Sequence, residues 1–283
     1  MEHEPSQLSI ARTHHCSTLL DNGSILITGG VSEESHAIDL AETLDPIAGR
    51  STLIADRHLP REQHRCVKLA DGRVALIGGA GANGRPEKRV EVFNPTKGTF
   101  SVLVDLKTAR VKHEVAMLRD GRILVAGGVD DEGNALDSAE VIDSVAGTST
   151  KLPSRMRFRR YEHAVAVLKN GLVLITVGGP AVRDGHTATL MKDGRVLIVG
   201  GGVPDFSDDL LGAPLLYNPQ SNSYVDLNLY APSVNRANHT AVLTWDGTVF
   251  VMGGRTLNSS ATKDVYAYDP AARTFRSVRR NAQ

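Results

Sequence analysis

The sequence predicts an all-β fold built from six copies of one short unit. Each copy opens with an arginine, has a histidine three residues later, and reaches an Asn-Gly or Asp-Gly pair seven residues after that histidine. Two adjacent glycines follow 14 and 15 residues after the histidine, or one residue later in the fourth copy. Six matches across these positions, at a period of about 50 residues, indicate a propeller or a solenoid rather than chance.

The repeat puts equivalent residues at fixed positions in every copy. The histidines are His15, His64, His113, His163, His186 and His239. The arginines are Arg12, Arg61, Arg110, Arg160, Arg183 and Arg236. Successive histidines are 49, 49, 50, 23 and 53 residues apart, so the fourth copy is much shorter than the others.

Each complete copy contains four short strands, which we name a to d in chain order. Apolar runs flank the Asn-Gly or Asp-Gly pair, and this pattern is typical of a hairpin with a two-residue turn in which both residues take a positive φ. We expect the glycine pair to end strand b, where the backbone needs a positive φ or a close approach. A further turn then joins strands c and d. It lies at Asp45-Pro46, Asn94-Pro95, Asp143-Ser144, Asn218-Pro219 and Asp269-Pro270.

Four antiparallel strands are the content of one blade of a β-propeller. We therefore expect a lead-in over residues 1–11 and a single propeller domain over residues 12–283. The fourth copy has no room for strands c and d. The main expectation is a six-bladed propeller whose fourth blade has two strands, and the alternative is a five-bladed ring with the extra hairpin displaced.

The amino-acid sequence of the repeats resembles that of the kelch repeat family. The Arg/His start, the glycine pair, Glu91 to Pro95 (EVFNP) and Tyr266 to Pro270 (YAYDP) carry the resemblance. It is nearest to bacterial kelch units similar to the central propeller of galactose oxidase, and it covers about residues 10–280. The resemblance implies the propeller fold but no particular activity, because kelch propellers include scaffolds, receptors and a few enzymes.

Composition excludes several classes of function. The chain has 32 basic and 32 acidic residues, which argues against a general nucleic-acid or membrane surface. It has no apolar run of membrane-spanning length, and residues 1–9 do not look like a secretory signal. Cys16 and Cys66 lie one and two residues after their histidines, so we expect them to face opposite ways as reduced core residues. Reduced cysteines favour a cytoplasmic protein.

Binding is expected on the edge that carries the b–c loops and the d–a linkers, because these segments vary while the a–b turns are nearly identical. The arginines that begin strand a lie at this edge and could bind a carboxylate or phosphate. The resemblance implies the same role, since arginines at this position take part in kelch domains that bind acidic peptides. The candidate ligand-binding residues are Arg61, Arg110, Arg160, Arg183 and Arg236. The alternative is that each arginine pairs within its own blade, as Glu42, Glu91 and Glu140 would allow.

The remaining predictions concern the histidines, the short copy and catalysis. We expect the six histidines to form hydrogen bonds between blades rather than a metal site, and we expect no metal or other cofactor. Strand b of the short copy, with Leu172, Leu174 and Thr176, is expected to leave an open edge for a partner strand or a second copy of the chain.

The sequence thus predicts a non-enzymatic scaffold that binds a protein or a small acidic ligand, with no nucleic-acid or membrane partner and no assigned catalytic residue. The alternative is an enzyme acting on a small molecule at the mouth of the channel, similar to a sugar epimerase or oxidase. Oxidase chemistry of the galactose oxidase type would need copper, His and Tyr ligands and a Cys–Tyr cross-link, a pattern that we do not find.

Overall fold

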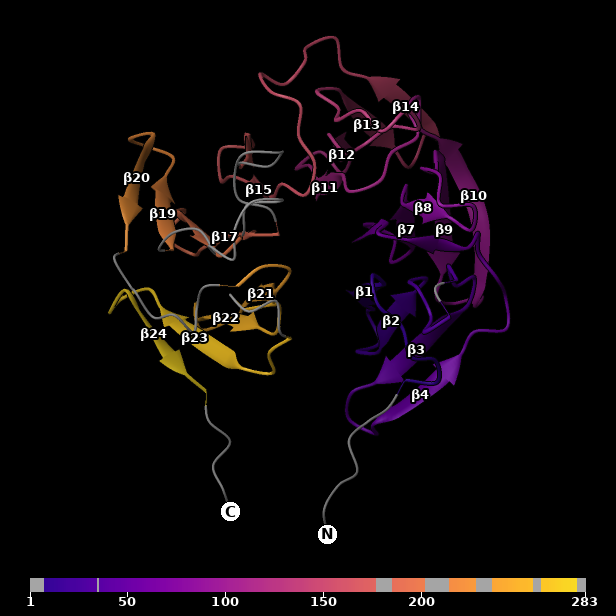
Figure 1. Ribbon diagram of the computed structural model, residues 1–283, viewed down its shortest axis with the longest axis horizontal. Coiled ribbons are helices and arrows are strands. Elements are labelled where there is room, and N and C mark those ends of the chain that lie inside the picture. The colour runs from indigo at the N-terminus through magenta and orange to yellow at the C-terminus, as the bar shows by residue number, and fades with distance from the viewer. Residues whose placement is uncertain are drawn as a thin grey trace. The chain divides into compact units, whose positions relative to one another are not determined.

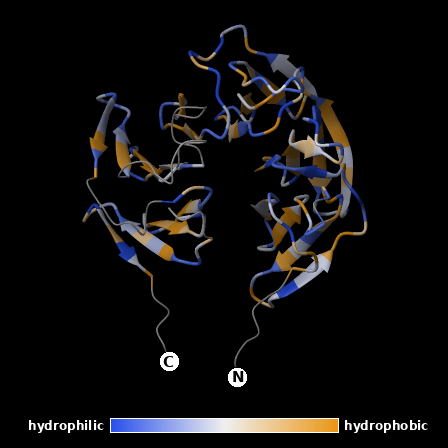
Figure 2. Ribbon diagram, viewed as in Figure 1, coloured by the Kyte–Doolittle hydropathy of each residue, from blue (hydrophilic) through white to orange (hydrophobic). Residues whose placement is uncertain are grey.

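The computed structural model describes residues 8–34, 36–176, 185–201, 214–227, 236–256 and 261–278. The regular elements in these ranges are β-strands, and they contain no helix able to cross a lipid bilayer. The chain divides into two compact units, Met1–Tyr161 and Glu162–Gln283. The single domain over residues 12–283 stays a prediction. Figure 1 shows the strands grouped into small sheets, and Figure 2 shows apolar residues concentrated in the strands and polar residues in the loops.

The first unit contains three four-stranded antiparallel blades. Blade one is β1 (Cys16–Leu19), β2 (Ile25–Thr28), β3 (Ala41–Asp45) and β4 (Arg50–Leu53). Blade two is β6 (Arg65–Lys68), β7 (Val74–Ile77), β9 (Arg89–Asn94) and β10 (Thr99–Asp105). Blade three is β11 (Glu114–Met117), β12 (Ile123–Ala126), β13 (Ala139–Asp143) and β14 (Thr148–Lys151). The first strands of these blades, β1, β6 and β11, lie side by side in that order.

The second unit contains a hairpin and two further blades. The hairpin is β15 (Val165–Val167) and β16 (Val173–Ile175). The next blade is β17 (Thr187–Leu190), β18 (Val196–Val199), β19 (Leu215–Asn218) and β20 (Ser223–Asp226). The last blade is β21 (Thr240–Leu243), β22 (Val249–Met252), β23 (Val265–Asp269) and β24 (Thr274–Ser277). Strand β15 lies beside β17, and β17 lies beside β21.

The number of blades corrects the main expectation. The described residues form five four-stranded blades, which matches the five-bladed alternative rather than the six-bladed propeller. The fourth copy forms only the hairpin β15–β16, whose two strands pair with each other and with no other strand in the described ranges. A blade needs strands c and d, and the described residues between this hairpin and β17 contain neither.

The a–b turns also differ from the expectation. In blade one, the Leu20 N–H bonds to the carbonyl of Ser24 and the Gly23 N–H bonds to the carbonyl of Leu20, which makes a three-residue loop. Gly23 has a φ of 83°, whereas Asn22 is not among the residues with positive φ. The Asn22 side chain instead accepts the Ser24 N–H at 3.0 Å. The Asn or Asp is therefore selected for this side-chain turn, and the glycine alone for its positive φ.

The hydrophobic core is divided into layers between successive blades. In β7, Val74 and Leu76 pack against Leu26 of blade one, while Ala75 and Ile77 pack against blade three. Because strand residues alternate between the two faces, both faces of the strand are buried. Equivalent strands in neighbouring blades therefore contact each other through different positions of the repeat: odd-numbered positions of one strand face even-numbered positions of the other.

The hairpin β15–β16 fills one such layer. Ala166 and Leu168 pack against Val196 and Ile198 of β18, while Leu197 and Val199 on the other face of β18 pack against the last blade. Two strands are therefore enough to cover one face of β17–β20 with apolar side chains. The short copy keeps the part of the repeat that buries its neighbour.

The glycine pair is required where one blade meets the next. Gly78 has a φ of 58°, and a methyl group there would overlap Cε1 of His113 and lie 2.6 Å from the carbonyl oxygen of Arg110. The adjacent Gly79 N–H donates to that same carbonyl at 3.0 Å. Both reasons expected from the sequence, positive φ and close approach, therefore apply.

We expect Gly78→Ala to lower the free energy of unfolding by roughly 2 to 5 kcal/mol, since it adds backbone strain to a steric clash. Gly84→Ala is the matched control in the same blade, because Gly84 has a φ of 73° but nothing within 4 Å of an added methyl group. It should cost about 1 to 2 kcal/mol. Urea denaturation measures both values, and equal losses would show that blade contact is not what selects Gly78.

Candidate functional site

A buried arginine lies four residues before strand a of each blade in the first unit. Arg61 donates from Nη2 to Glu91 at 2.6 Å, and from Nη1 to the carbonyls of Gly78 and Arg89 at 2.9 and 3.0 Å. Arg110 makes the equivalent bonds to Glu140 at 2.8 Å and to the carbonyl of Gly127 at 2.7 Å. Both arginines have no exposed surface. These contacts join the start of strand a to the end of strand b and the start of strand c.

The glutamate of strand c gathers further donors. Glu140 accepts the Lys107 and Thr108 N–H groups of the preceding d–a linker at 2.6 and 2.9 Å, and the Ser149 hydroxyl at 2.9 Å. In blade one, Glu42 accepts from Arg12, from the Ser9 N–H and from Ser51.

These bonds set the pKa of Glu42. Burial acts to raise it, but the hydrogen bonds from Ser51 and Ser9 and the charge of Arg12 outweigh burial and lower the pKa. The carboxylate is therefore the form that the fold holds.

The arginines of the first unit therefore make the pairing within the blade that the sequence offered as the alternative. The guanidiniums of Arg61 and Arg110 are buried against Glu91 and Glu140, and ligand binding by these two arginines stays a prediction. The sequence pattern alone did not separate the two roles, because an arginine at the start of strand a suits either one.

The other three candidate arginines have different surroundings. Arg236 has no exposed surface, donates to the carbonyls of Gly253 and Asp264 at 2.8 and 3.1 Å, and lies 5.0 Å from the ring centroid of Tyr266. Tyr266 thus stands where the first three blades have glutamate. Arg160 is half-buried, and burial lowers its pKa. Arg183 lies outside the described residues.

Three of the repeated histidines, His64, His186 and His239, form hydrogen bonds between neighbouring sheets. Nε2 of His64 lies 2.8 Å from Oγ1 of Thr28 in blade one. His186 makes the equivalent contact to Thr176 at 2.5 Å. His239 lies 2.9 Å from the hydroxyl of Thr187, which begins strand a of the preceding blade. Burial, followed by repulsion from Arg236, lowers the pKa of His239 from 6.5 to about 4. The imidazole is neutral at pH 7, as a hydrogen-bonded core histidine should be.

The residue before each histidine has a positive φ, which the sequence analysis did not foresee. The φ values are 54° at His14, 51° at Gln63, 56° at Lys112, 50° at Glu162, 66° at Gly185 and 55° at Asn238. This conformation lets carbonyl and N–H groups of equivalent residues meet across blades. The Gln63 N–H donates to the carbonyl of His14 at 3.0 Å, and the Asn238 N–H donates to that of Gly185 at 2.8 Å.

The two cysteines contradict the expectation that they are reduced and face opposite ways. The structure joins Cys16 of β1 and Cys66 of β6 by a disulfide, with their Cα atoms 6.1 Å apart. Neighbouring blades meet through residues of opposite parity, so two positions that differ by one residue in the repeat face each other. The separation of 50 residues, about one repeat period, was the signal for this pairing. The cytoplasmic prediction loses the support it drew from reduced thiols.

The b–c loops of the first unit are ordered hairpins with a shared stem and different tips. In blade two, β8 (Ala80–Gly81) pairs with β5 (Arg61–Glu62), and Ala80 also bridges to Pro86. Blade one has the bridges Thr13–Val31–Ala37, and blade three has Val111–Val129–Ala135. The exposed tips carry Glu33, Glu34, Asn83, Arg85, Asp131 and Glu132. Arg85 lies 3.6 Å from Asp131 of the next tip.

The residues of the predicted open edge are placed unequally. Leu172 is 65% exposed and precedes β16, whereas Leu174 is half-buried within it. Thr176 is buried, with its hydroxyl bonded to the carbonyl of Ala164 at 3.0 Å and to His186. Thr176 is thus part of the blade-to-blade contact, and partner binding at this edge stays a prediction.

Two pockets lie on the opposite edge, among the a–b and c–d turns. One, of about 630 Å³, is lined by Asn22, Asp71 and Asn94, and the other, of about 330 Å³, by Asn170, Asp193 and Asn218. The lining positions are equivalent in the repeat. These pockets therefore follow from the packing of successive copies and do not mark a specific site.

Comparison with known proteins agrees with this architecture. Residues 117–156 and 236–280 match the Kelch motif family. Multiple epidermal growth factor-like domains protein 8 of Homo sapiens is 31% identical over 93 residues, and that of Mus musculus is 32% identical over 98 residues. These matches cover 33% and 34% of this chain but 3% of each relative.

Two solved structures share the fold. The structure of YjhT is 14% identical, with a TM-score of 0.67 over 97% of this chain and 99% of that one. A fungal alcohol oxidase of the AA5 family, in complex with copper, is 18% identical, with a TM-score of 0.73 over 95% of this chain and 65% of that one. Such low identities show the fold alone.

Repeated four-stranded blades and these structural neighbours define the chain as a β-propeller. The Arg/His start, the glycine pair and the two motif matches identify it further as a kelch-repeat β-propeller.

We expect Arg110→Ala to lower the free energy of unfolding by about 3 to 5 kcal/mol, because Glu140 would remain as a buried charge without its partner. Arg122→Ala is the control, since Arg122 forms an exposed ion pair with Asp120, and solvent screening leaves such a pair little effect on stability. Urea denaturation at pH 7 compares the two. A loss for Arg110→Ala no larger than for the control would contradict the architectural role.

We also expect the protein to lose stability as the pH falls from 6.5 toward 4. The unfolded chain takes up a proton on His239 near pH 6.5, whereas the folded chain does so only near pH 4. The stabilisation is therefore fully present above pH 6.5 and is lost as the pH falls toward 4, and this difference corresponds to about 3 kcal/mol. Denaturation across this range should show a flatter profile for His239→Gln. His36→Gln, at an exposed histidine, should leave the profile unchanged.

Proposed function

We propose that this kelch propeller is a binding module that recognises a protein partner through its b–c loop tips and d–a linkers. The observation that carries the proposal is the contrast within one repeated unit. The stems of the b–c hairpins in blades one to three have equivalent bridges, while the tips differ in sequence and charge. A rigid stem with a variable tip is the arrangement that loop-based recognition uses.

Charge at these tips favours basic side chains in the part of a partner that contacts them, whereas the d–a linker after blade three exposes Arg155, Arg157 and Arg159 and favours acidic side chains there. Glu33, Glu34, Asp131 and Glu132 are exposed there, against Arg85 as the basic tip residue. Negative tips attract basic groups and repel acidic ones. The buried placement of Arg61 and Arg110 points the same way, because it removes two of the arginines on which an acidic ligand would depend.

The alternative is an enzyme acting on a small molecule. Its support is the shared fold with a copper-containing alcohol oxidase, a likeness that does not extend to activity at 18% identity. Cys16 and Cys66 are joined to each other, so neither is available for a Cys–Tyr cross-link. We therefore favour binding over oxidation as the function.

Affinity capture from a native lysate tests the proposal. The tagged chain should retain specific proteins, and the quadruple variant Glu33→Ala, Glu34→Ala, Asp131→Ala, Glu132→Ala should lose them at least about tenfold, the effect expected when several interface charges are removed. The control is Asp21→Asn, Asp71→Asn, Asp120→Asn. It also removes negative charge, but at the a–b turns on the opposite edge, and it keeps an oxygen for the turn.

Retention of the same proteins by both variants would contradict the loop-tip proposal. No captured protein, together with turnover of a sugar or alcohol by the purified chain, would favour the enzyme instead.

A further inference from the structure

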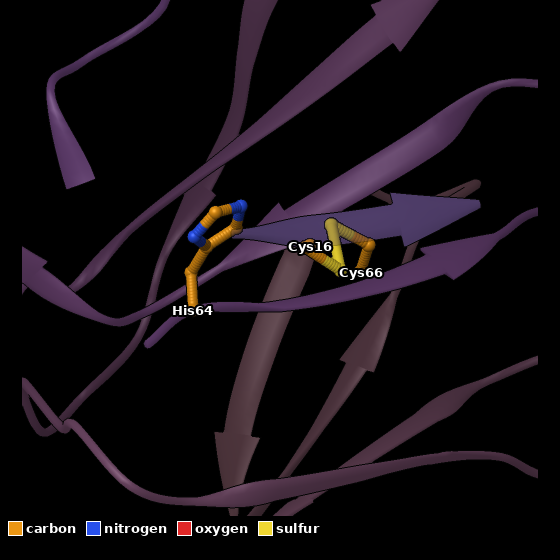
Figure 3. A group of neighbouring side chains, drawn as sticks. All are labelled: Cys16, His64 and Cys66. Carbon is orange, nitrogen blue, oxygen red and sulfur yellow. A yellow bond between two sulfur atoms is a disulfide. The ribbon is translucent and has the colours of Figure 1, made fainter. Parts of the chain in front are cut away.

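A cluster of metal-ligating side chains lies between blades one and two, away from the loop tips. Within the described residues, one group of three such side chains brings a ligand atom from each member within 4.8 Å of the others, and it consists of Cys16, His64 and Cys66. Figure 3 shows the imidazole of His64 beside the two joined sulfur atoms. Blade one contributes one ligand, and blade two contributes the other two.

The surroundings of the cluster bring the imidazole to the sulfur atoms. Thr28 pairs with Cys16 in the β1–β2 register, and its hydroxyl lies 2.8 Å from Nε2 of His64 and 3.5 Å from Sγ of Cys66. His64 is 1% exposed, whereas both cysteines are half-buried. The site is therefore anchored in the core and still open to small reactants at its sulfur side.

The two cysteines are not part of the repeated pattern, so the cluster is not a feature that every blade needs in order to fold. At the position of Cys16 the next two blades have Arg65 and Glu114, and at the position of Cys66 the third blade has Val115. The repeated fold thus forms without sulfur at either position. A pair of cysteines that the scaffold does not need calls for a chemical explanation.

We propose that Cys16, Cys66 and His64 form a redox-gated site for Zn²⁺, closed while the disulfide is present and able to bind one ion when it is reduced. Two thiolates and one imidazole are a ligand set that Zn²⁺ prefers, and water would complete a four-coordinate site. The complex of Zn²⁺ with two thiolates has no net charge, which suits a half-buried position.

The gating step needs a dithiol reductant. One thiolate of the reductant attacks a sulfur of the Cys16–Cys66 bond and forms a mixed disulfide, and its second thiol then displaces the remaining cysteine. Two electrons and two protons pass to the cysteines, and the reductant leaves as its own disulfide. Binding of Zn²⁺ then releases the two thiol protons to solvent as the metal–sulfur bonds form.

Reduction and metal binding require only a small movement. Once the bond between them is broken, the two sulfur atoms must move apart, whereas the His64 nitrogen, within 4.8 Å of them, must approach by at most about 1 Å. These shifts would give metal–ligand distances of about 2.3 Å for sulfur and about 2.0 Å for nitrogen. The Thr28 hydroxyl, already next to both His64 and Cys66, can then donate a hydrogen bond to a bound thiolate. The proposal concerns the blade interface and does not depend on what the loop tips bind.

Cobalt titration tests this site, with Co²⁺ as the spectroscopic probe for Zn²⁺. The full chain is reduced with dithiothreitol, freed of it by gel filtration under nitrogen, and checked for two free thiols and an unchanged circular dichroism spectrum. We expect one Co²⁺ per chain, a thiolate-to-cobalt charge-transfer band, and loss of that band when Zn²⁺ is added. The oxidised chain should bind none.

Single substitutions separate a specific site from adventitious binding. Cys16→Ser, Cys66→Ser and His64→Gln should each weaken Co²⁺ binding at least about tenfold, and both cysteine variants should lose intensity in the charge-transfer band. His113→Gln is the matched control, since it changes the same repeat position in the next blade, where no cysteine is present. It should keep both the band and the affinity.

Four results would overturn the proposal. They are a reduced, folded chain that takes up no Co²⁺, an oxidised chain that binds it equally well, a band that survives loss of both cysteines, and unfolding of the chain on reduction. If His64→Gln fails to fold, the two cysteine variants still decide the matter.

Discussion

The buried bond between the arginine of strand a and the glutamate of strand c is the interaction on which the first three blades depend. In each blade it joins residues 30 positions apart, and the same arginine also binds carbonyls at the end of strand b and the start of strand c. The glutamate adds the d–a linker of the preceding blade, as Glu140 does with Lys107 and Thr108. A buried pair of charges is stable only when its remaining hydrogen-bonding capacity is met, and here the backbone of the blade meets it. In the last blade Tyr266 takes the place of the glutamate and offers its ring to Arg236.

Contact between blades depends on a second set of residues, the glycine pair and the histidine. Glycine lets the end of strand b approach the carbonyl of the next arginine. At three of the blade contacts the histidine also bonds to a threonine of the preceding copy, as His64 does to Thr28. The apolar layers also connect neighbouring blades. A central strand such as β7 buries alternate residues in the layers on its two sides. This explains why a hairpin suffices at the fourth copy. It supplies Ala166 and Leu168 to the layer that β18 requires, and the residues that the structure describes complete that layer from β15–β16 and the following blade.

The residues on which the two proposals rest are those that differ between the repeated blades. Loop tips such as Glu33, Arg85 and Asp131 lie beyond the bridges that order the hairpin stems. Cys16 and Cys66 are of the same kind, since the other blades reach the same packing without sulfur at those positions. The two proposals therefore concern separate places, one at the exposed edge of the blades and one at the interface of two of them.

Periodicity in the sequence was enough to identify the strands, their order, the turns and the kelch repeat, because each depends on residues close together in the chain. It also identified Glu42, Glu91 and Glu140 as partners for the arginines, since a fixed spacing of 30 residues repeats a fixed contact. What periodicity did not provide was how neighbouring copies face each other. The positive φ before each histidine, the count of five complete blades in the described residues and the pairing of Cys16 with Cys66 depend on that arrangement. The alternation of side chains between the two faces of a strand follows from the strand itself. Which face of one blade contacts which face of the next depends on how the sheets pack, and only the folded chain shows that.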